Sequence, residues 1–394
     1  MTETCDVLVA GAGIHGAGVA QAAAAAGYSV VVAEMNSIAA ATSSRSSKLI
    51  HGGLRYLEQM RLGLVRECLR ERALLLRLAP ELVRLERFFI PVYRDTDRRP
   101  WWIRTGLSLY AVLGGLRPGN RFRVLDRSEW RRLDGLRTEN LQAVFAYQDG
   151  QTDDAALTRA VMRSACSLGA RLVLPAELVH ARVHRQGIHC ALATAEGVRT
   201  VEAGVLINAT GPWVNRVLNC IEPAVKKLPI DLVQGSHILL EHPLREGVYY
   251  LEAPSDRRAI FLMPWHGHTL IGTTERPFDG DPAAVCPSET EQRYLLQNAG
   301  HYFPELADNG RAGLVDSFAG LRVLPARAGR AFRRSREIIL HTDRRVRPRV
   351  LSIYGGKLTS YRADALKVMR RVAASLPDRK ARADTADLAL SPDD

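Results

Sequence analysis

The sequence predicts an α/β protein of two domains, one built on a parallel dinucleotide-binding sheet and one on an antiparallel sheet. At 394 residues the chain is longer than one ordinary domain. It opens with a strand, a glycine-rich turn and a helix, the order of a dinucleotide-binding unit. Residues 235–240, 259–263 and 268–273 have the pattern of antiparallel strands, and the sequence His266-Gly267-His268 predicts a hairpin turn between the last two.

The dinucleotide unit has the order strand, turn, helix, strand, acid. Residues 6–10 form a short, β-branched, apolar strand, and Gly11-Ala12-Gly13-Ile14-His15-Gly16 follows at once. Residues 17–26 have the composition of a helix. Residues 28–33 then form a second strand that ends at Glu34.

Each glycine of this unit, and the acid that follows it, has a physical task. Gly11 permits a tight turn, Gly13 lets the backbone approach a pyrophosphate, and Gly16 lets the helix pack closely on the strand. The helix N-terminus faces the phosphate charge, and Glu34 accepts hydrogen bonds from a ribose. The segment therefore predicts dinucleotide binding.

Two later segments favour FAD over NAD. Residues 205–209 form a buried strand that ends in Ala209-Thr210-Gly211, where two-domain flavoproteins return to their FAD domain. Residues 350–354 form another strand, and Gly355-Gly356 are predicted to open a helix. Glycines at a helix N-terminus present N–H groups to the electron-rich edge of a reduced flavin, and Lys357 adds charge nearby.

The composition is that of a globular protein in a reducing compartment. Hydrophobic residues make up 46% of the chain and charged residues 24%, which allows a sizeable core. The six cysteines are scattered without a C-x-x-C pair, so no disulfide framework and no metal site are expected. The acidic N-terminus runs directly into a strand, so we expect no export signal and a cytoplasmic location.

The net charge of +12 suggests an acidic partner. Nucleic acid, anionic lipid and a phosphorylated substrate all agree with this charge. No zinc-finger spacing and no RNP-type motif occurs, so nucleic acid is not the expected partner.

Seven motifs in order resemble the FAD-dependent, quinone-linked glycerol-3-phosphate dehydrogenases. They are GAGIHGAG (11–18), ATSSRSSKLIHGGLRYLE (41–58), NATGPWV (208–214), QGSHILL (234–240), MPWHGHTLIGTTE (263–275), AGLRVL (319–324) and GGKLTSYR (355–362). The second and the last are highly specific to this family. The resemblance implies a two-domain FAD-binding Rossmann-like fold of the D-amino-acid-oxidase/glutathione-reductase type, with an antiparallel-sheet substrate domain.

The resemblance also implies the residues that bind FAD. Besides Gly11, Gly13, Ile14, His15, Gly16 and Glu34, they are Thr42, Ser43, Ser46, Ser47, Lys48, Leu49, His51, Gly52, Gly53, Ala209, Thr210, Gly211, Trp213, Gly356, Lys357, Leu358 and Thr359. The serines lie in no G-x-S-x-G elbow, so they are interpreted as a hydroxyl-lined flavin loop. Asp153-Asp154 is interpreted as the N-cap of a helix over residues 155–165, because no companion metal ligands are apparent.

The implied reaction oxidises sn-glycerol 3-phosphate to dihydroxyacetone phosphate by hydride transfer to flavin N5, and electrons pass on to membrane quinone. The substrate phosphate needs cations, for which Arg55 and Arg322 are expected, with Lys357 near both flavin and substrate. Tyr56 and Thr274 are expected to supply orienting hydroxyls.

The general base stays open between His51 and His237, since imidazole titrates near working pH. His237 lies on a predicted strand, where a satisfied core histidine is the alternative. His51 lies in the motif loop, where it could hydrogen-bond FAD instead. A water activated by a cation, or deprotonation assisted by the flavin, could replace both.

The chain also departs from the family pattern. His15 lies where asparagine is common, Glu275 where aspartate is common, and AGLRVL replaces S-G-V-R-P-L. The usual C-terminal helical domain of roughly a hundred residues, a common domain size, is not found after the last motif. The acceptor, the oligomeric state and the consequence of that difference are left open by the sequence.

The FAD domain is predicted to be discontinuous, comprising residues 1–85, 146–225 and 315–394, while residues 86–145 and 226–314 form the substrate domain. Residues 98–110 contain paired tryptophans among arginines followed by an apolar helix. This pattern fits an interfacial element on an anionic membrane surface, or a helix packed inside the substrate domain.

Other functions remain as alternatives. One is a flavoenzyme that oxidises a 2-hydroxy acid or an amino acid, although such enzymes lack SSKLIHGGLRYL. Another is an oxidase that uses oxygen, and a third is a paralogue that binds FAD or membrane without turnover. Retention of Arg55, Arg322 and Lys357 argues against the last.

Overall fold

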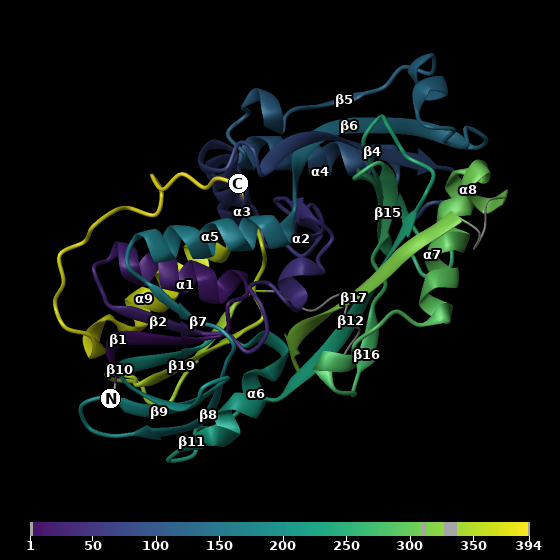
Figure 1. Cartoon of the computed structure of the whole chain (residues 1–394). Coiled ribbons are helices and arrows are strands. Elements are labelled where there is room, and N and C mark those ends of the chain that lie inside the picture. The colour runs from purple at the N-terminus through teal and green to yellow at the C-terminus, as the bar shows by residue number, and fades with distance from the viewer. Residues whose placement is uncertain (1–2, 309–312, 327–336, 393–394) are drawn as a thin grey trace.

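Two β-sheets lie side by side and carry helices on their faces (Figure 1). The structure is a computed structural model, and it describes residues 3–308, 313–326 and 337–392. No helix in the described part of the chain is both long and apolar enough to cross a membrane.

The first sheet has nine strands in the order β11-β8-β9-β10-β1-β2-β7, with β19 beside β10 and β18 beside β19. Its strands are β1 (Glu3–Ala10), β2 (Val30–Ala33), β7 (Arg171–Val173), β8 (Ala176–Val183), β9 (Ile188–Thr194), β10 (Gly197–Asn208), β11 (Ile221–Glu222), β18 (Ile339–Thr342) and β19 (Val350–Tyr354). Helices α1 (Ile14–Ala25), α5 (Asp154–Ser167) and α9 (Tyr361–Val372) share one face, and α6 (Val214–Val217) follows β10.

The alanines of α1 explain how this layer packs. The helix is buried on nearly every side, because α5 and α9 flank it above the sheet. Alanine and glycine side chains let these neighbours approach closely; a Cβ atom at Gly18 would lie 2.7 Å from the ring of Tyr361. The predicted order of strand, glycine turn, helix and strand is therefore confirmed.

The second sheet has ten strands in the order β16-β12-β15-β14-β13-β4-β6-β3, with β17 beside β12 and β5 beside β6. Its strands are β3 (Leu49–Ile50), β4 (Val83–Tyr93), β5 (Phe122–Val124), β6 (Leu141–Thr152), β12 (Ile230–Leu240), β13 (Val248–Glu252), β14 (Ala259–Trp265), β15 (His268–Gly272), β16 (Arg276–Phe278) and β17 (Leu314–Pro325). All but the β4–β13 pair run antiparallel.

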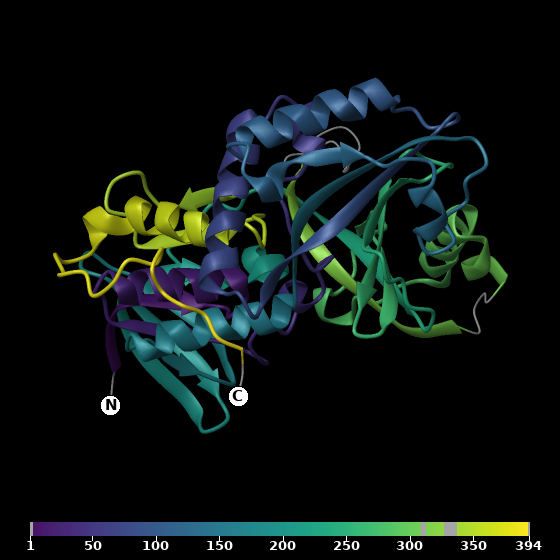
Figure 2. The same cartoon turned by 90° about the horizontal axis from the view of Figure 1, so that it is seen from above.

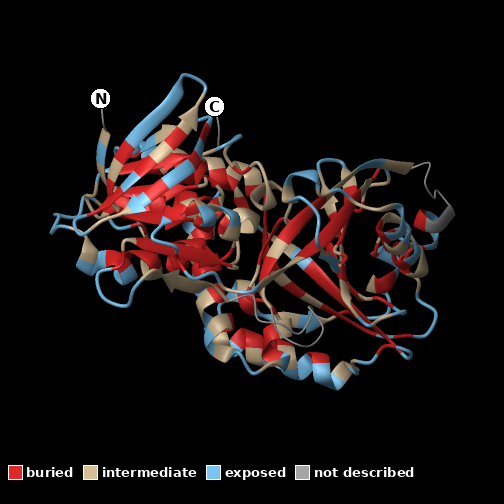
Figure 3. Ribbon diagram, turned by 90° about the horizontal axis from the view of Figure 1, so that it is seen from below, coloured by how far each residue is buried: buried red, intermediate tan, exposed pale blue. Residues whose placement is uncertain are grey.

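Helices cover both faces of this sheet, and Figure 3 shows the buried layer between them. On one face lie α2 (Arg55–Glu58), α3 (Leu62–Leu78) and α4 (Pro100–Leu113), and on the other α7 (Glu289–Tyr302) and α8 (Pro304–Asp308). Side chains of β4 alternate between the two: Phe88 and Ile90 pack toward α3 and α4, and Phe89 toward α7.

The predicted hairpin joins β14 to β15 through a two-residue turn. Trp265 pairs with His268, and His266 and Gly267 have φ angles of 48° and 80°. Two positive φ values in succession are typical of the tight turn that matches the twist of a hairpin. The predicted antiparallel strands are therefore confirmed.

One predicted element is wrong. Gly355 and Gly356 do not open a helix, because their φ angles are 72° and 99° and α9 begins only at Tyr361. A right-handed helix cannot include two successive residues in the left-handed region. The glycines instead form a loop that turns back toward α1.

Two of the predicted domain boundaries fall within strands of the second sheet. Residue 146 falls inside β6, and residue 315 falls at the start of β17, which pairs with β12 of the second sheet along its length. Residues 327–336 of the last predicted piece lie outside the described residues. The discontinuous division stays a prediction, with β17 assigned to the second sheet.

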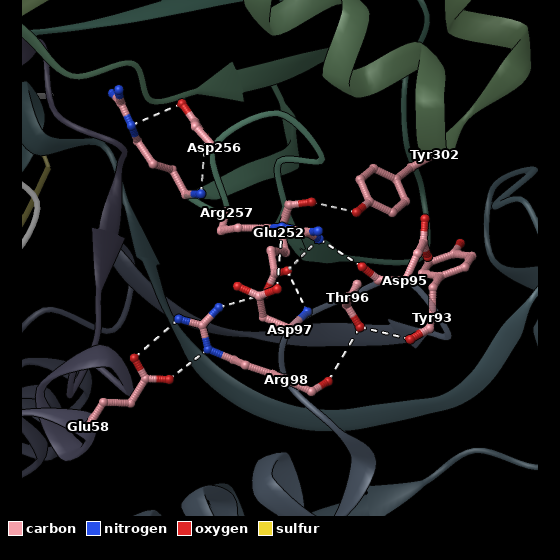
Figure 4. A network of polar contacts seen from close by, with 11 residues as sticks. Glu58, Tyr93, Asp95, Thr96, Asp97, Arg98, Glu252, Asp256, Arg257 and Tyr302 are labelled. Atoms are coloured by element: carbon pink, nitrogen blue, oxygen red, sulfur yellow. Dashed lines mark hydrogen bonds and ion pairs between the residues drawn. The ribbon is translucent and has the colours of Figure 1, made fainter.

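A polar network fixes the start of α4 (Figure 4). The guanidinium of Arg98 donates to Glu58 at 2.6 and 3.1 Å and to Glu252 at 2.8 Å. Asp97 N also donates to Glu252 at 2.8 Å, and Arg257 donates to the carbonyl of Asp95 at 2.7 Å. The network therefore ties the end of α2, in the motif segment, to β13 of the second sheet.

We predict that Glu71→Ala lowers the free energy of unfolding by about 3–5 kcal/mol, because it leaves a buried guanidinium without its partner. Glu71 on α3 accepts two hydrogen bonds from Arg362 on α9, at 2.7 and 2.8 Å, and both side chains are over 90% buried. Urea unfolding would measure the change. The control is Glu246→Ala, which breaks the exposed Arg87 pair and should cost less than about 1 kcal/mol. Equal costs would contradict a structural role for the buried pair.

Candidate functional site

A cavity of about 640 Å³ lies where the two sheets meet. Its walls are the glycine turn before α1, the loop of residues 40–51, the end of β10, the loop of residues 355–359, and the facing strands β12 and β17. The cavity thus brings together four segments that the sequence identified separately. All come from ends of strands, where open α/β sheets bind their ligands.

A buried ion pair shapes the loop of residues 40–51. Lys48 Nζ lies 2.6 Å from Asp154 Oδ1 and donates to the carbonyl of Ser44 at 2.6 Å. Ser46 N donates to the other carboxylate oxygen of Asp154 at 2.8 Å. Asp153 caps α5 through Ala156 N, as predicted, whereas Asp154 anchors the loop.

The same lysine reaches the second sheet. Its Nζ lies 5.5 Å from the ring centre of Trp265 and 5.2 Å from that of Phe318, within the range of cation–π attraction. Lys48 does not line the cavity, and its donors are engaged by Asp154 and Ser44. It therefore positions the loop, whereas the sequence analysis expected it to touch FAD.

The glycine turn and Glu34 fit a dinucleotide. A Cβ atom at Gly16 would lie 1.9 Å from the carbonyl oxygen of Gly11, so the turn closes only with glycine there. Glu34 lines the cavity, and its two oxygens accept from Ala12 N at 2.7 Å and Asn36 N at 2.8 Å. Each oxygen keeps a further lone pair for a ribose hydroxyl. Ser43 Oγ accepts from Ile14 N at 2.9 Å and fastens the motif loop to the start of α1.

The two loops expected at the flavin are joined by His51. Its backbone N donates to Thr359 Oγ1 at 3.2 Å, and both residues line the cavity. The next amide, Gly52 N, donates to Tyr110 Oη on α4 at 2.8 Å. The imidazole of His51 thus stands on a backbone held from two sides.

His237 is a buried, neutral histidine at the cavity wall. Its Nε2 lies 2.9 Å from Ser47 Oγ, and its ring stacks on Phe318 at 4.9 Å. Burial, together with the charges of Arg322 and Lys48, lowers the pKa of His237 to about 3. A group with this pKa holds a transferred proton weakly, which argues against His237 as the base and leaves His51 as a prediction.

Arg322 on β17 is the guanidinium of the cavity wall. Its Nη2 donates to Thr273 Oγ1 at 2.9 Å, and its Nη1 to the carbonyl of Thr274 at 3.3 Å. Glu275 lies 3.8 Å away, and the arginine side chain is 18% exposed. These contacts orient the planar group at the open space.

Thr274 itself lies behind this wall. Its hydroxyl donates to Glu291 Oε1 at 2.6 Å and accepts from Ser236 N at 2.8 Å. Burial raises the pKa of Glu291, but the hydrogen bonds from Thr274, Ser288 and Ser236 lower it below its ordinary value. Thr274 does not line the cavity, so it supports Arg322 through the backbone and is not in reach of a substrate.

Lys357, in the loop of residues 355–359, contacts Tyr56 on α2 at the cavity wall. Lys357 Nζ lies 3.7 Å from the ring centre of Tyr56 and 4.0 Å from Cys68 Sγ, and both Lys357 and Tyr56 line the cavity. Arg55 lies 5.7 Å from the same ring but does not line the cavity. Of the two expected phosphate clamps, only Arg322 is therefore in contact with the space.

Most of the expected residues line one cavity. They are Gly11, Gly13, Ile14, His15, Glu34, Thr42, Ser43, Ser46, Ser47, Leu49, His51, Tyr56, Ala209, Thr210, Gly211, Trp213, His237, Arg322, Gly356, Lys357, Leu358 and Thr359. Gly16, Lys48, Gly52, Gly53, Arg55 and Thr274 lie outside its lining. Sequence reasoning missed the roles of Asp154 and Glu291. The capping position of Asp154 pointed to α5, and the capping-box spacing of Ser288 and Glu291 could have marked Glu291 only as the start of α7.

Comparison with known proteins agrees with this geometry. The FAD dependent oxidoreductase (DAO) family model matches residues 6–362. Glycerol-3-phosphate dehydrogenase of Pseudomonas aeruginosa is 40% identical, over 92% of this chain and 70% of its own length. D-erythritol 1-phosphate dehydrogenase of Brucella abortus is 36% identical, over 95% of this chain and 75% of its own.

A solved structure gives the same result. Glycerol-3-phosphate dehydrogenase from Bacillus halodurans, complexed with FAD, superposes with a TM-score of 0.76 at 28% identity, covering 98% of this chain and 68% of that one. The chain therefore belongs to the FAD-dependent oxidoreductase family, among the relatives of glycerol-3-phosphate dehydrogenase, and FAD is its cofactor.

Proposed function

We propose that this protein oxidises sn-glycerol 3-phosphate to dihydroxyacetone phosphate and passes the electrons to membrane quinone. The observation that carries the proposal is that Arg322 on β17 and Lys357 in the loop of residues 355–359 line the same cavity as the other loops expected at FAD. A guanidinium in a partly dry site suits a phosphate group and equally the carboxylate of an amino acid or a 2-hydroxy acid, so the choice of a phosphate ester also rests on the relatives. The relatives that match along most of the chain act, by their names, on glycerol 3-phosphate or D-erythritol 1-phosphate.

FAD held in this cavity would supply the hydride acceptor for the carbon that carries the secondary hydroxyl. His51 takes the hydroxyl proton, because its imidazole lines the cavity between the motif loop and Thr359. His237 stays neutral and orients Ser47. Arg322 binds the phosphate and Lys357 lies beside both reactants. Arg55 contributes positive potential from behind Tyr56.

Quinone is lipid-soluble, so we place the membrane contact at α4. Trp101 and Trp102 are 65% and 45% exposed, and Val112 is 59% exposed further along the helix. Arg99 and Arg104 add positive charge, which suits an anionic lipid surface. The helix runs along the outer edge of the molecule (Figure 2). The protein would thus be cytoplasmic and peripheral on the inner face of the membrane.

The first expected outcome concerns the substrate. Under anaerobic conditions, sn-glycerol 3-phosphate should bleach the oxidised flavin band of the purified holoprotein, whereas glycerol and a 2-hydroxy acid should not. D-Erythritol 1-phosphate belongs in the same series, because a relative of that name matches 95% of the chain. Faster bleaching by D-erythritol 1-phosphate would show that this longer ester is the preferred substrate. Bleaching by glycerol or by the hydroxy acid would show that the enzyme does not require a phosphate group on its substrate.

The second concerns the phosphate clamp. Arg322→Ala should lower kcat/KM for glycerol 3-phosphate by at least about 30-fold, the cost of one charged hydrogen-bonding partner. The matched control is Arg276→Ala: both arginines lie on strands paired with β12, but Arg276 is exposed and does not line the cavity. Steady-state kinetics with an artificial acceptor would separate them. Similar losses in both variants would take Arg322 out of the site.

The third concerns the membrane. In flotation with vesicles that contain phosphatidylglycerol, the wild-type protein should rise with the lipid, and Trp101→Ala/Trp102→Ala should stay at the bottom. Neutral phosphatidylcholine vesicles test the contribution of charge. Unchanged flotation of the double variant would move the contact away from α4, and no flotation of the wild type would argue against membrane quinone as the acceptor.

A further inference from the structure

One titratable side chain lies between the two glycine loops of the cofactor site. His15 is the second residue of α1, and a Cβ atom on Gly356 would lie 2.3 Å from its Nε2. The imidazole therefore packs directly on the backbone of the loop of residues 355–359. It also lines the cavity. No step of the proposed oxidation uses it.

A buried carboxylate stands behind this imidazole. His15 Nε2 lies 3.5 Å from Asp364 Oδ2, and the side chains are 15% and 3% exposed. Ser360 Oγ donates to the same oxygen at 2.8 Å, and Lys367 Nζ lies 3.1 Å from the other oxygen. Burial raises the pKa of Asp364, but the nearby imidazole of His15, the ammonium of Lys367 and the hydrogen bond from Ser360 lower it below its ordinary value. The carboxylate is thus built to stay ionised.

The pair continues to the surface. Lys367 Nζ also donates to Glu67 Oε1 on α3 at 2.7 Å, and these two side chains are 34% and 29% exposed. The line from the cavity is therefore imidazole, carboxylate, ammonium and carboxylate. The line links the imidazole to partly exposed groups on the side away from the cavity.

We infer that His15, held by Asp364, is an acid–base group for bound FAD that takes up a proton when the flavin is reduced. The inference rests on the proposed function only through the cofactor and does not depend on which substrate supplies the electrons. A hydride would bring two electrons and one proton to FAD, and the reduced cofactor would carry one more negative charge. A second proton, taken from solvent, would bind the imidazole of His15, and the imidazolium would offset that charge. On reoxidation two electrons go to the acceptor and both protons are released.

Other charges around His15 set the background of this equilibrium. They are Asp364 and Lys367 on α9, Glu67 on α3, Lys357 in the adjoining loop, and His51 in the motif loop. Lys367 is paired with Glu67 and Asp364 together, while Lys357 Nζ is turned toward Tyr56 and Cys68. These groups are the same in a variant that changes only His15, so a difference in proton uptake belongs to the imidazole.

The test is the reduction potential of the holoprotein, followed from about pH 6 to about pH 9, across and above the imidazole range. Reduction by dithionite or light needs no glycerol 3-phosphate, so a wrong substrate leaves the experiment intact. Above the imidazole range, the wild type should take up one more proton per two electrons than His15→Asn. One proton in a two-electron couple corresponds to about 30 mV per pH unit. A purely structural role for His15 would shift the potential without changing this slope.

Two variants complete the design. Asp364→Asn should also lose the extra proton, because its imidazolium has no carboxylate partner. His189→Asn removes an exposed imidazole from β9, which does not line the cavity, and should keep the wild-type slope. A wild-type slope in His15→Asn would overturn the inference. Loss of FAD by both His15→Asn and Asp364→Asn would overturn it as well, since a pair that acts on reduction is not needed to hold oxidised FAD.

Discussion

The ion pair between Lys48 and Asp154 is the contact on which the site depends. It is fully buried, and it joins the motif loop to α5 of the first layer while the lysine also lies against Trp265 and Phe318 of the second sheet. A lone charge at this depth would be very costly, so neither partner can leave without the other. The loop is therefore locked at one place between the two sheets. Ser47, His51 and Tyr56 take their positions from that lock.

From this point the electrostatics of the cavity follow. Lys48 and Arg322 approach His237 from two sides, and together with burial they keep its imidazole neutral. His51 lies on the same loop, joined to Thr359. Two histidines that line one cavity thus stand in different surroundings, which we propose suit them to different tasks. The second sheet supplies the fixed cation, and a buried carboxylate, Glu291, holds the strand ends behind it.

How much of this was readable in the sequence depends on the range of each contact. The turn from Gly11 to Gly16 is local, and its spacing predicted a dinucleotide-binding unit, while the later segments around residues 209 and 355 pointed to FAD. The start of α9 was missed because nothing in Gly355-Gly356 distinguishes a helix N-terminus from a left-handed loop. Asp154 meets Lys48 across 106 residues, and Glu291 meets Ser236 across 55. No sequence motif contains contacts over such separations. The sequence therefore located the site, but only the fold shows which residues line the cavity and which hold those residues in place.

The motif loop is also tied to the surface of the molecule. Tyr110 on α4 accepts from Gly52 N at 2.8 Å and donates to Asp149 at 2.6 Å, and Asp149 in turn is paired with Arg72 on α3. Both faces of the loop are thus held, by α5 on one side and by α4 on the other. The α4 contact places the exposed tryptophans on the same rigid element as the hydroxyl that fixes the backbone beside His51. A lipid surface that bound α4 would therefore act directly on the segment proposed to remove the substrate proton.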